Sequence, residues 1–109
     1  MSKNSILEKL QTALNDPGSQ KSGEYLQDLV AKQLKRSVDD DRAGVVQALE
    51  AWLKTREEPQ TMLAVRMAMA FEIKELRQSI EQLAREIEKG DTFLPYYKRW
   101  TDEALDKLA

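Results

Sequence analysis

The stretch from Pro59 to Gly90 decides the fold, and it opens with the sequence MLAVRMAMAF at residues 62–71. It contains no glycine or proline between its two ends, so it holds none of the residues that usually interrupt a helix. Its opening is apolar nearly all the way round a helix, with Arg66 as the one charge. Because a helix that is apolar on every side is normally buried, we expect this segment to form the centre of the core.

The composition of the whole chain predicts an all-α fold. The 109 residues are 41% apolar and 33% charged, which is typical of a folded domain rather than of a disordered chain. Strong helix formers dominate, and no run of alternating β-branched residues indicates a strand. We therefore expect a single helical domain over residues 1–109, with a flexible N-terminus at residues 1–4.

Amphipathic segments outside the central stretch predict further helices. Apolar side chains recur at helical spacing in residues 5–14, 23–36 and 42–56, and again after Gly90. We expect five or six helices, packed as antiparallel pairs in a short stack or bundle. Three adjacent carboxylates at residues 39–41 precede the third segment, where we expect them to cap a helix rather than to bind a metal ion.

The central stretch also allows a second interpretation, as one long helix over residues 59–89. Two series of residues, apolar except for one arginine, recur there with a spacing of seven: Met62, Met69, Leu76 and Leu83, and Arg66, Ile73, Ile80 and Ile87. Such a heptad pattern favours a parallel two-stranded coiled coil. The alternative to the helix pairs is therefore a homodimeric coiled-coil protein, an adaptor or chaperone for a helical partner.

An internal repeat supports the arrangement in helix pairs. Similar apolar patterns are centred on Leu10, Leu49 and Leu83, and each pattern is followed by a break and then by another amphipathic segment. Residues 45–91 resemble the HEAT-repeat family, in which helix pairs stack side by side. This resemblance implies a protein-interaction or scaffold module of the helical-repeat type.

The composition disfavours several classes of function. Basic and acidic residues number 17 and 19, so a net charge of -2 gives no bulk attraction to nucleic acid or to anionic lipid. The sequence contains no cysteine and no histidine, which removes thiol chemistry, the commonest general base and the commonest transition-metal ligand. The longest apolar run, residues 62–71, is too short to span a bilayer. We expect a cytoplasmic, non-catalytic protein with no cofactor and no membrane partner.

Arg66 is the first candidate interaction residue. Its neighbours three and four positions away are all apolar, so its own helix offers no carboxylate partner. Because a buried guanidinium without a partner is costly, we expect an ion pair with an acidic residue of another helix, or a head group that reaches solvent along its own stem. The functional alternative is a site for a carboxylate or phosphate group of a partner.

The second candidate is the sequence YYKRW, formed by Tyr96, Tyr97, Lys98, Arg99 and Trp100. Aromatic residues and arginine are typical of the hot spots of protein interfaces, and the same mixture can stack on bases. In the structural alternative, Tyr97 and Trp100 belong to the core while Lys98 and Arg99 are solvated. We expect another protein as the partner, with a homo-oligomer as a further possibility and a small nucleic-acid-binding protein as the least favoured function.

Overall fold

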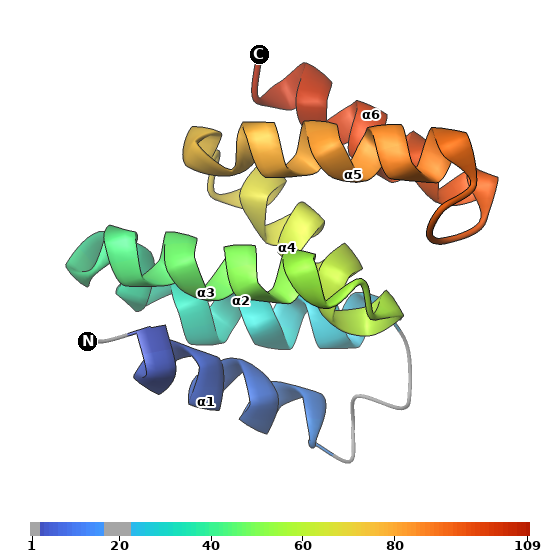
Figure 1. Cartoon of the computed structure of the whole chain (residues 1–109). Coiled ribbons are helices and arrows are strands. Elements are labelled where there is room, and N and C mark those ends of the chain that lie inside the picture. Colours follow the sequence, from blue (N-terminus) through green and yellow to red (C-terminus); the bar gives the residue numbers. More distant parts are fainter. Residues whose placement is uncertain (1–2, 17–22) are drawn as a thin grey trace. The chain divides into compact units, whose positions relative to one another are not determined.

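The structure, a computed structural model, describes residues 3–16 and 23–109. In these residues the α-helices are α1 (Lys3–Leu14), α2 (Gly23–Asp40), α3 (Arg42–Thr55), α4 (Glu58–Ala70), α5 (Arg77–Lys89) and α6 (Lys98–Lys107) (Figure 1). Two short 3₁₀ segments, η2 (Lys74–Leu76) and η3 (Pro95–Tyr97), precede α5 and α6. The described residues contain no strand, so the predicted all-α fold is confirmed.

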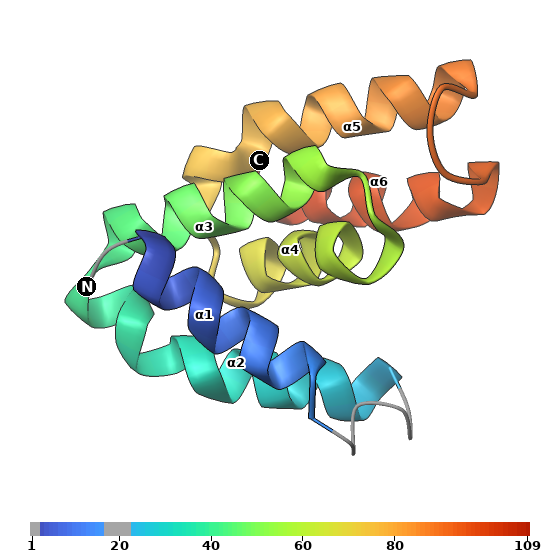
Figure 2. The ribbon, with the colours of Figure 1, turned by 60° about the horizontal axis from the view of Figure 1, so that its bottom comes forward.

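The chain divides into two compact units, Met1–Ala48 and Leu49–Ala109, and α3 contributes residues to both. In the first unit α1 packs against α2, and the two helices run antiparallel (Figures 1 and 2). The buried apolar residues of this unit are Ile6, Leu10, Ala13, Val30, Leu34, Val45 and Ala48. The candidate interaction residues named above all belong to the second unit.

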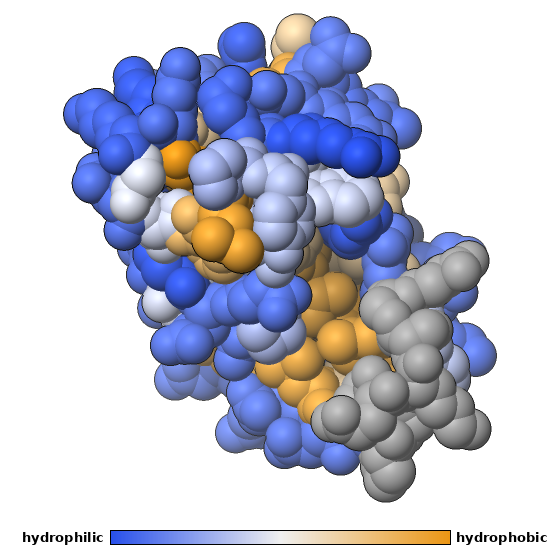
Figure 3. All heavy atoms as spheres, turned by 90° about the vertical axis from the view of Figure 1, so that its right-hand side faces the viewer, coloured by the Kyte–Doolittle hydropathy of each residue, from blue (hydrophilic) through white to orange (hydrophobic). Residues whose placement is uncertain are grey.

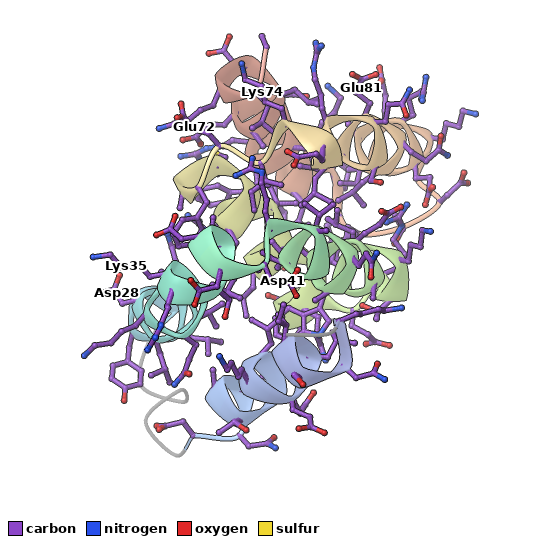
Figure 4. All side chains as sticks on the ribbon, turned by 90° about the vertical axis from the view of Figure 1, so that its left-hand side faces the viewer. Asp28, Lys35, Asp41, Glu72, Lys74 and Glu81 are labelled. Carbon is purple, nitrogen blue, oxygen red and sulfur yellow. The ribbon has the colours of Figure 1, made fainter. Side chains whose placement is uncertain are left out.

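A single residue, Asp41, separates α2 from α3 (Figure 4). Its Oδ1 accepts a hydrogen bond from the N–H of Gly44 at 3.1 Å, so the predicted capping role is confirmed for this aspartate. A Cβ atom on Gly44 would clash with the carboxylate of Asp41, whose Cγ would lie at 2.9 Å, so glycine at this position lets the capping side chain close over the start of α3. The sequence predicted a longer break between these helices, but α2 continues to Asp40, whose carboxylate pairs with Arg36 one turn earlier at 3.3 Å.

The central stretch forms two helices, α4 and α5, so the interpretation as one long helix is wrong. Glu72, which follows the C-cap residue Phe71 of α4, has a φ of 50°, in the left-handed region. The N–H of Ile73 donates to the carbonyl of Ala68 at 2.9 Å, and the N–H of Glu72 donates to that of Met69 at 3.3 Å. These are the two hydrogen bonds of a Schellman C-cap, which ends a helix. The coiled-coil dimer required a continuous helix and is contradicted with it.

In the second unit α6 packs against both α4 and α5, and α5 and α6 run antiparallel (Figures 1 and 2). The helix α4 is buried over most of its surface, as its sequence predicts, through Thr61, Met62, Leu63, Ala64, Val65, Met67 and Ala68. Its start is fixed to the end of α3, because the Thr61 hydroxyl donates to the Trp52 carbonyl at 2.9 Å. Trp52 itself is buried, as expected of a core residue.

Part of the N-terminal segment that was expected to be flexible is helical. Lys3 and Asn4, expected to belong to a flexible N-terminus, form the start of α1, while Met1 and Ser2 lie outside the described residues. The single-domain organisation stays a prediction. Within the described residues, every helix is too short or too polar to cross a membrane.

Candidate interaction surface

The structure brings the two candidates together, because the guanidinium of Arg66 on α4 lies over the ring of Trp100 on α6. The distance from the guanidinium carbon to the ring centroid is 3.9 Å. Among the described residues Arg66 forms no ion pair, so the predicted pairing with an acid of another helix is wrong. The negative face of the indole takes the place of the carboxylate, which gives a cation–π contact of about 0.5–2 kcal/mol.

Arg99 contacts the same ring from its own helix. Its guanidinium carbon lies 5.5 Å from the centroid of Trp100, and the residue as a whole is exposed. In the described part of the chain, no carboxylate forms an ion pair with Arg99 either. Two positively charged groups therefore contact one half-buried indole. Contact with the ring leaves N–H groups of both guanidinium groups available to donate hydrogen bonds to a partner.

Three aromatic side chains form a cluster at the start of α6. The rings of Tyr96 and Tyr97 are stacked, with centroids 4.4 Å apart, and the ring of Phe93 lies tilted against Tyr97 at 5.3 Å. Phe93 has a φ of 53°, which is rare for an aromatic residue and costs about 1–3 kcal/mol. Tyr96, Arg99 and Trp100 are three and four residues apart, so they follow one side of the η3–α6 segment.

Two large apolar residues of this region are exposed. The exposed fraction is 59% for Leu94 and 61% for Tyr96. Figure 3 faces the connection between α5 and η3 and shows an apolar cluster there among mostly hydrophilic side chains. We define the Trp100 patch as Arg66, Leu94, Tyr96, Tyr97, Arg99 and Trp100.

The hydroxyl of Tyr97 is the most strongly perturbed titratable group of the patch. Its pKa is raised from 10.0 to about 12, first by its hydrogen bond with Tyr96, then by burial and by the negative charge of Glu58. The neutral phenol is therefore the form present at physiological pH. The stacking of the Tyr96 ring on the Tyr97 ring, with centroids 4.4 Å apart, limits the freedom that Tyr96 would lose on binding a partner.

Lys98 is the one predicted residue that does not contribute to the patch. Its ammonium group donates to both carboxylate oxygens of Asp102, at 3.1 and 2.9 Å, one turn further along α6. This hydrogen bond and the charge of Asp102 raise the pKa of Lys98 above its ordinary value. The charge of Lys98 is thus already compensated within its own helix.

Elsewhere in the second unit the main polar feature is a bidentate ion pair. Arg56 donates from Nε and Nη2 to the two oxygens of Glu86, at 3.0 and 2.9 Å, and from Nη1 to the carbonyl of Leu53 at 2.6 Å. A shallow pocket of about 210 Å³ adjoins this pair and is lined by Leu53, Lys54, Arg56, Gln78, Ser79 and Gln82. The pocket is small and its one arginine is already paired, so it is a weaker candidate than the Trp100 patch.

The acidic side chains of the described residues do not gather into a metal site. In Figure 4, Glu72 and Glu81 are spread along one side of the second unit rather than directed toward a common point. Glu81 pairs with Arg77 at 3.4 Å.

The sequence identified five of the six patch residues but missed Leu94. The neighbouring Pro95 places Leu94 outside a helix, but it does not show whether the side chain is buried or exposed. The Arg56–Glu86 pair was also missed, because its two residues lie on different elements and share no local spacing. In the first unit Tyr25, on the amphipathic segment predicted over residues 23–36, is 40% exposed.

Comparison of the chain with models of protein families, with curated proteins and with solved structures gave no match. The resemblance of residues 45–91 to HEAT repeats therefore stays a prediction.

Proposed function

We propose that this protein is a non-catalytic interaction module of the helical-repeat type that binds another protein through the Trp100 patch. The observation that carries the proposal is the exposure of Leu94 and Tyr96, at 59% and 61%, on the segment that leads into Trp100, whose ring two arginines contact. Tyrosine, tryptophan and arginine are the residue types most enriched where the energy of protein binding is concentrated. A cytoplasmic location stays a prediction.

The Trp100 patch combines aromatic rings that contact one another with apolar surface that the chain leaves uncovered. Each apolar Å² that a partner covers contributes about 25 cal/mol, and both exposed side chains offer such surface. The rings of Phe93, Tyr96 and Tyr97 already contact one another, so little side-chain entropy remains to be lost on binding. The partner that fits is a protein segment with apolar side chains of its own.

Site-specific photo-crosslinking tests this proposal. A benzoylphenylalanine residue replaces Tyr96 in one version of the protein and Arg85, an exposed residue of α5, in a control version. In the cells that make the protein, we expect a discrete adduct with another protein from position 96 and none from position 85. The purified partner should then bind the wild-type chain and bind Leu94→Ser at least about tenfold more weakly.

Two results would contradict the proposal. One is an adduct pattern that is the same from both positions, since this would reflect random collisions. The other is a purified partner that binds Leu94→Ser and the wild type equally well, since its contact would then lie outside the patch.

A further inference from the structure

We infer that the Trp100 patch selects an acidic partner, a short segment in which a carboxylate lies next to an apolar side chain. The inference rests on the proposed function and adds to it the chemistry of the partner. It begins from the two arginines of the patch, which come from different helices and share one indole ring.

The charges of the two arginines suit a negatively charged partner. Several basic residues of the described chain are compensated by a carboxylate, for example Lys98 by Asp102 and Arg56 by Glu86, at 2.9 Å in both cases. Within the same described residues, Arg66 and Arg99 form no ion pair. An approaching carboxylate therefore meets two guanidinium groups and does not have to displace an acid of the chain itself.

The position of the Arg66 guanidinium group over Trp100 suits a carboxylate. Stacking on an aromatic face fixes the plane of a guanidinium group and leaves its edge free to form two parallel hydrogen bonds with a carboxylate. Arg66 is held in this way at 3.9 Å from the centroid of Trp100. A free phosphate could take the same hydrogen bonds, but it would leave the apolar part of the patch uncovered.

The exposed apolar side chains of the patch suit a partner that also carries apolar side chains. Leu94 and Tyr96 are exposed, and Tyr96 lies three and four residues before Arg99 and Trp100 along the η3–α6 segment. A segment that places a carboxylate at the arginines can therefore place a leucine or an aromatic side chain against Tyr96. Single-stranded nucleic acid also combines negative charge with flat rings, but the net charge of -2 gives the protein no general attraction to it.

Titration with labelled synthetic peptides tests the inference by fluorescence anisotropy. The probe is a short peptide in which aspartate alternates with leucine. Two matched peptides replace either every aspartate by asparagine or every leucine by glycine, and a single-stranded oligo(dT) serves as the nucleic-acid probe. We expect the aspartate–leucine peptide to bind at least about tenfold more tightly than either matched peptide.

Variants locate the binding on the patch. Arg99→Gln removes an exposed charge, and we expect it to weaken binding of the acidic peptide by about tenfold. Arg66→Gln should also weaken binding of the acidic peptide, and its urea midpoint shows whether this variant is folded. If it is unfolded, the affinity of Arg99→Gln alone decides whether the peptide binds at the patch. Arg85→Gln removes one positive charge from α5 and should leave the affinity unchanged.

The contradicting outcomes are distinct. Equal binding of the asparagine peptide overturns the acidic preference but leaves the proposed function intact. If oligo(dT) binds more tightly than the aspartate–leucine peptide, the partner is nucleic acid and not an acidic segment. If light scattering shows a wild-type dimer that Arg99→Gln dissociates, the partner is a second copy of the chain. If no peptide binds, the inference fails, and the photo-crosslinking from position 96 shows separately whether the proposed function fails with it.

Discussion

At the scale of single residues, Arg66 shows how an indole ring can replace a carboxylate as the partner of a half-buried cation. An ion pair would have compensated the charge completely, whereas the contact with Trp100 at 3.9 Å leaves the hydrogen-bond donors available. The contrast with Arg56 is direct, since its guanidinium group already donates to both oxygens of Glu86 and to the carbonyl of Leu53. Arg66 therefore suits a binding role, and Arg56 suits a structural role.

The structural role of Arg56 leads to the first prediction. We expect Arg56→Ala to lower the free energy of unfolding by about 2 kcal/mol, because it breaks two charge-assisted hydrogen bonds and leaves Glu86 without its main partner. Urea unfolding of both proteins measures the loss. The control is Arg77→Ala, which removes an exposed pair with Glu81 and should cost less than about 0.5 kcal/mol. Equal losses in the two variants would contradict the prediction.

The same ion pair predicts a dependence of stability on pH. The pKa of Glu86 is lowered from 4.5, first by the hydrogen bond from Arg56 and then by that from Gln82. Because the folded value lies below the unfolded one, the stabilisation is fully present above about pH 4.5 and is lost as the pH falls through the folded pKa. We expect the stability difference between the wild type and Glu86→Gln to shrink in this range. A difference that grows on acidification would show that the sign is wrong.

Tyr97 gives a prediction at the opposite end of the pH scale. Its pKa of about 12 arises first from the hydrogen bond with Tyr96, so Tyr96→Phe should lower that pKa toward 10.0. Since the folded pKa is raised, the stability from this contact is present below about pH 10 and is lost as the pH rises through the folded value. Titration of the tyrosine ring carbons by NMR measures both values. A wild-type Tyr97 that ionises at 10.0 would contradict the contact.

At the scale of elements, the end of α4 determines the architecture of the second unit. The chain reverses at Glu72, which adopts the left-handed conformation that glycine accepts without cost. This reversal is what separates α4 from α5 and places Ile73 and Leu76 in the core.

A substitution at Glu72 distinguishes the two interpretations of the central stretch. In a Schellman cap, Glu72→Gly removes the strain of the left-handed residue and should stabilise the protein by about 1 kcal/mol. In a continuous helix the same substitution would destabilise it by a similar amount. Urea unfolding gives the sign, with Arg85→Gly inside α5 as a control that we expect to lose about 1 kcal/mol. A loss at both positions would favour the long helix.

At this scale the sequence predicts the helices well and their boundaries less well. The apolar period of α4 and the glycine at the end of α5 are local signals, and Gly90 has the expected positive φ of 81°. The end of α4 has no such signal, because a glutamate occupies the left-handed position and the heptad pattern continues through it. The reversal follows from the burial of Ile73 and Leu76 against other elements, which no local pattern contains.

At the scale of the whole molecule, the sequence could name the residue types of the candidate site but not their partners. The three aromatic residues and the one arginine of residues 96–100 were apparent from the sequence alone. The contact between Arg66 and Trp100 joins α4 to α6 and depends on how those helices pack, so spacing along the chain could not predict it. The exposure of Leu94 likewise follows from the path of the loop before η3.

The central claim is that binding energy is concentrated on the Trp100 patch, and an NMR map of the 109-residue chain tests it most directly. The isotope-labelled chain is titrated with the aspartate–leucine peptide, and shifts of the backbone, indole and guanidinium N–H signals are recorded. We predict that the largest changes occur at the Trp100 indole, at the side chains of Arg66 and Arg99, and at the amides of residues 94–97. Changes centred on the pocket beside Arg56, or spread evenly over the helices, would contradict the claim.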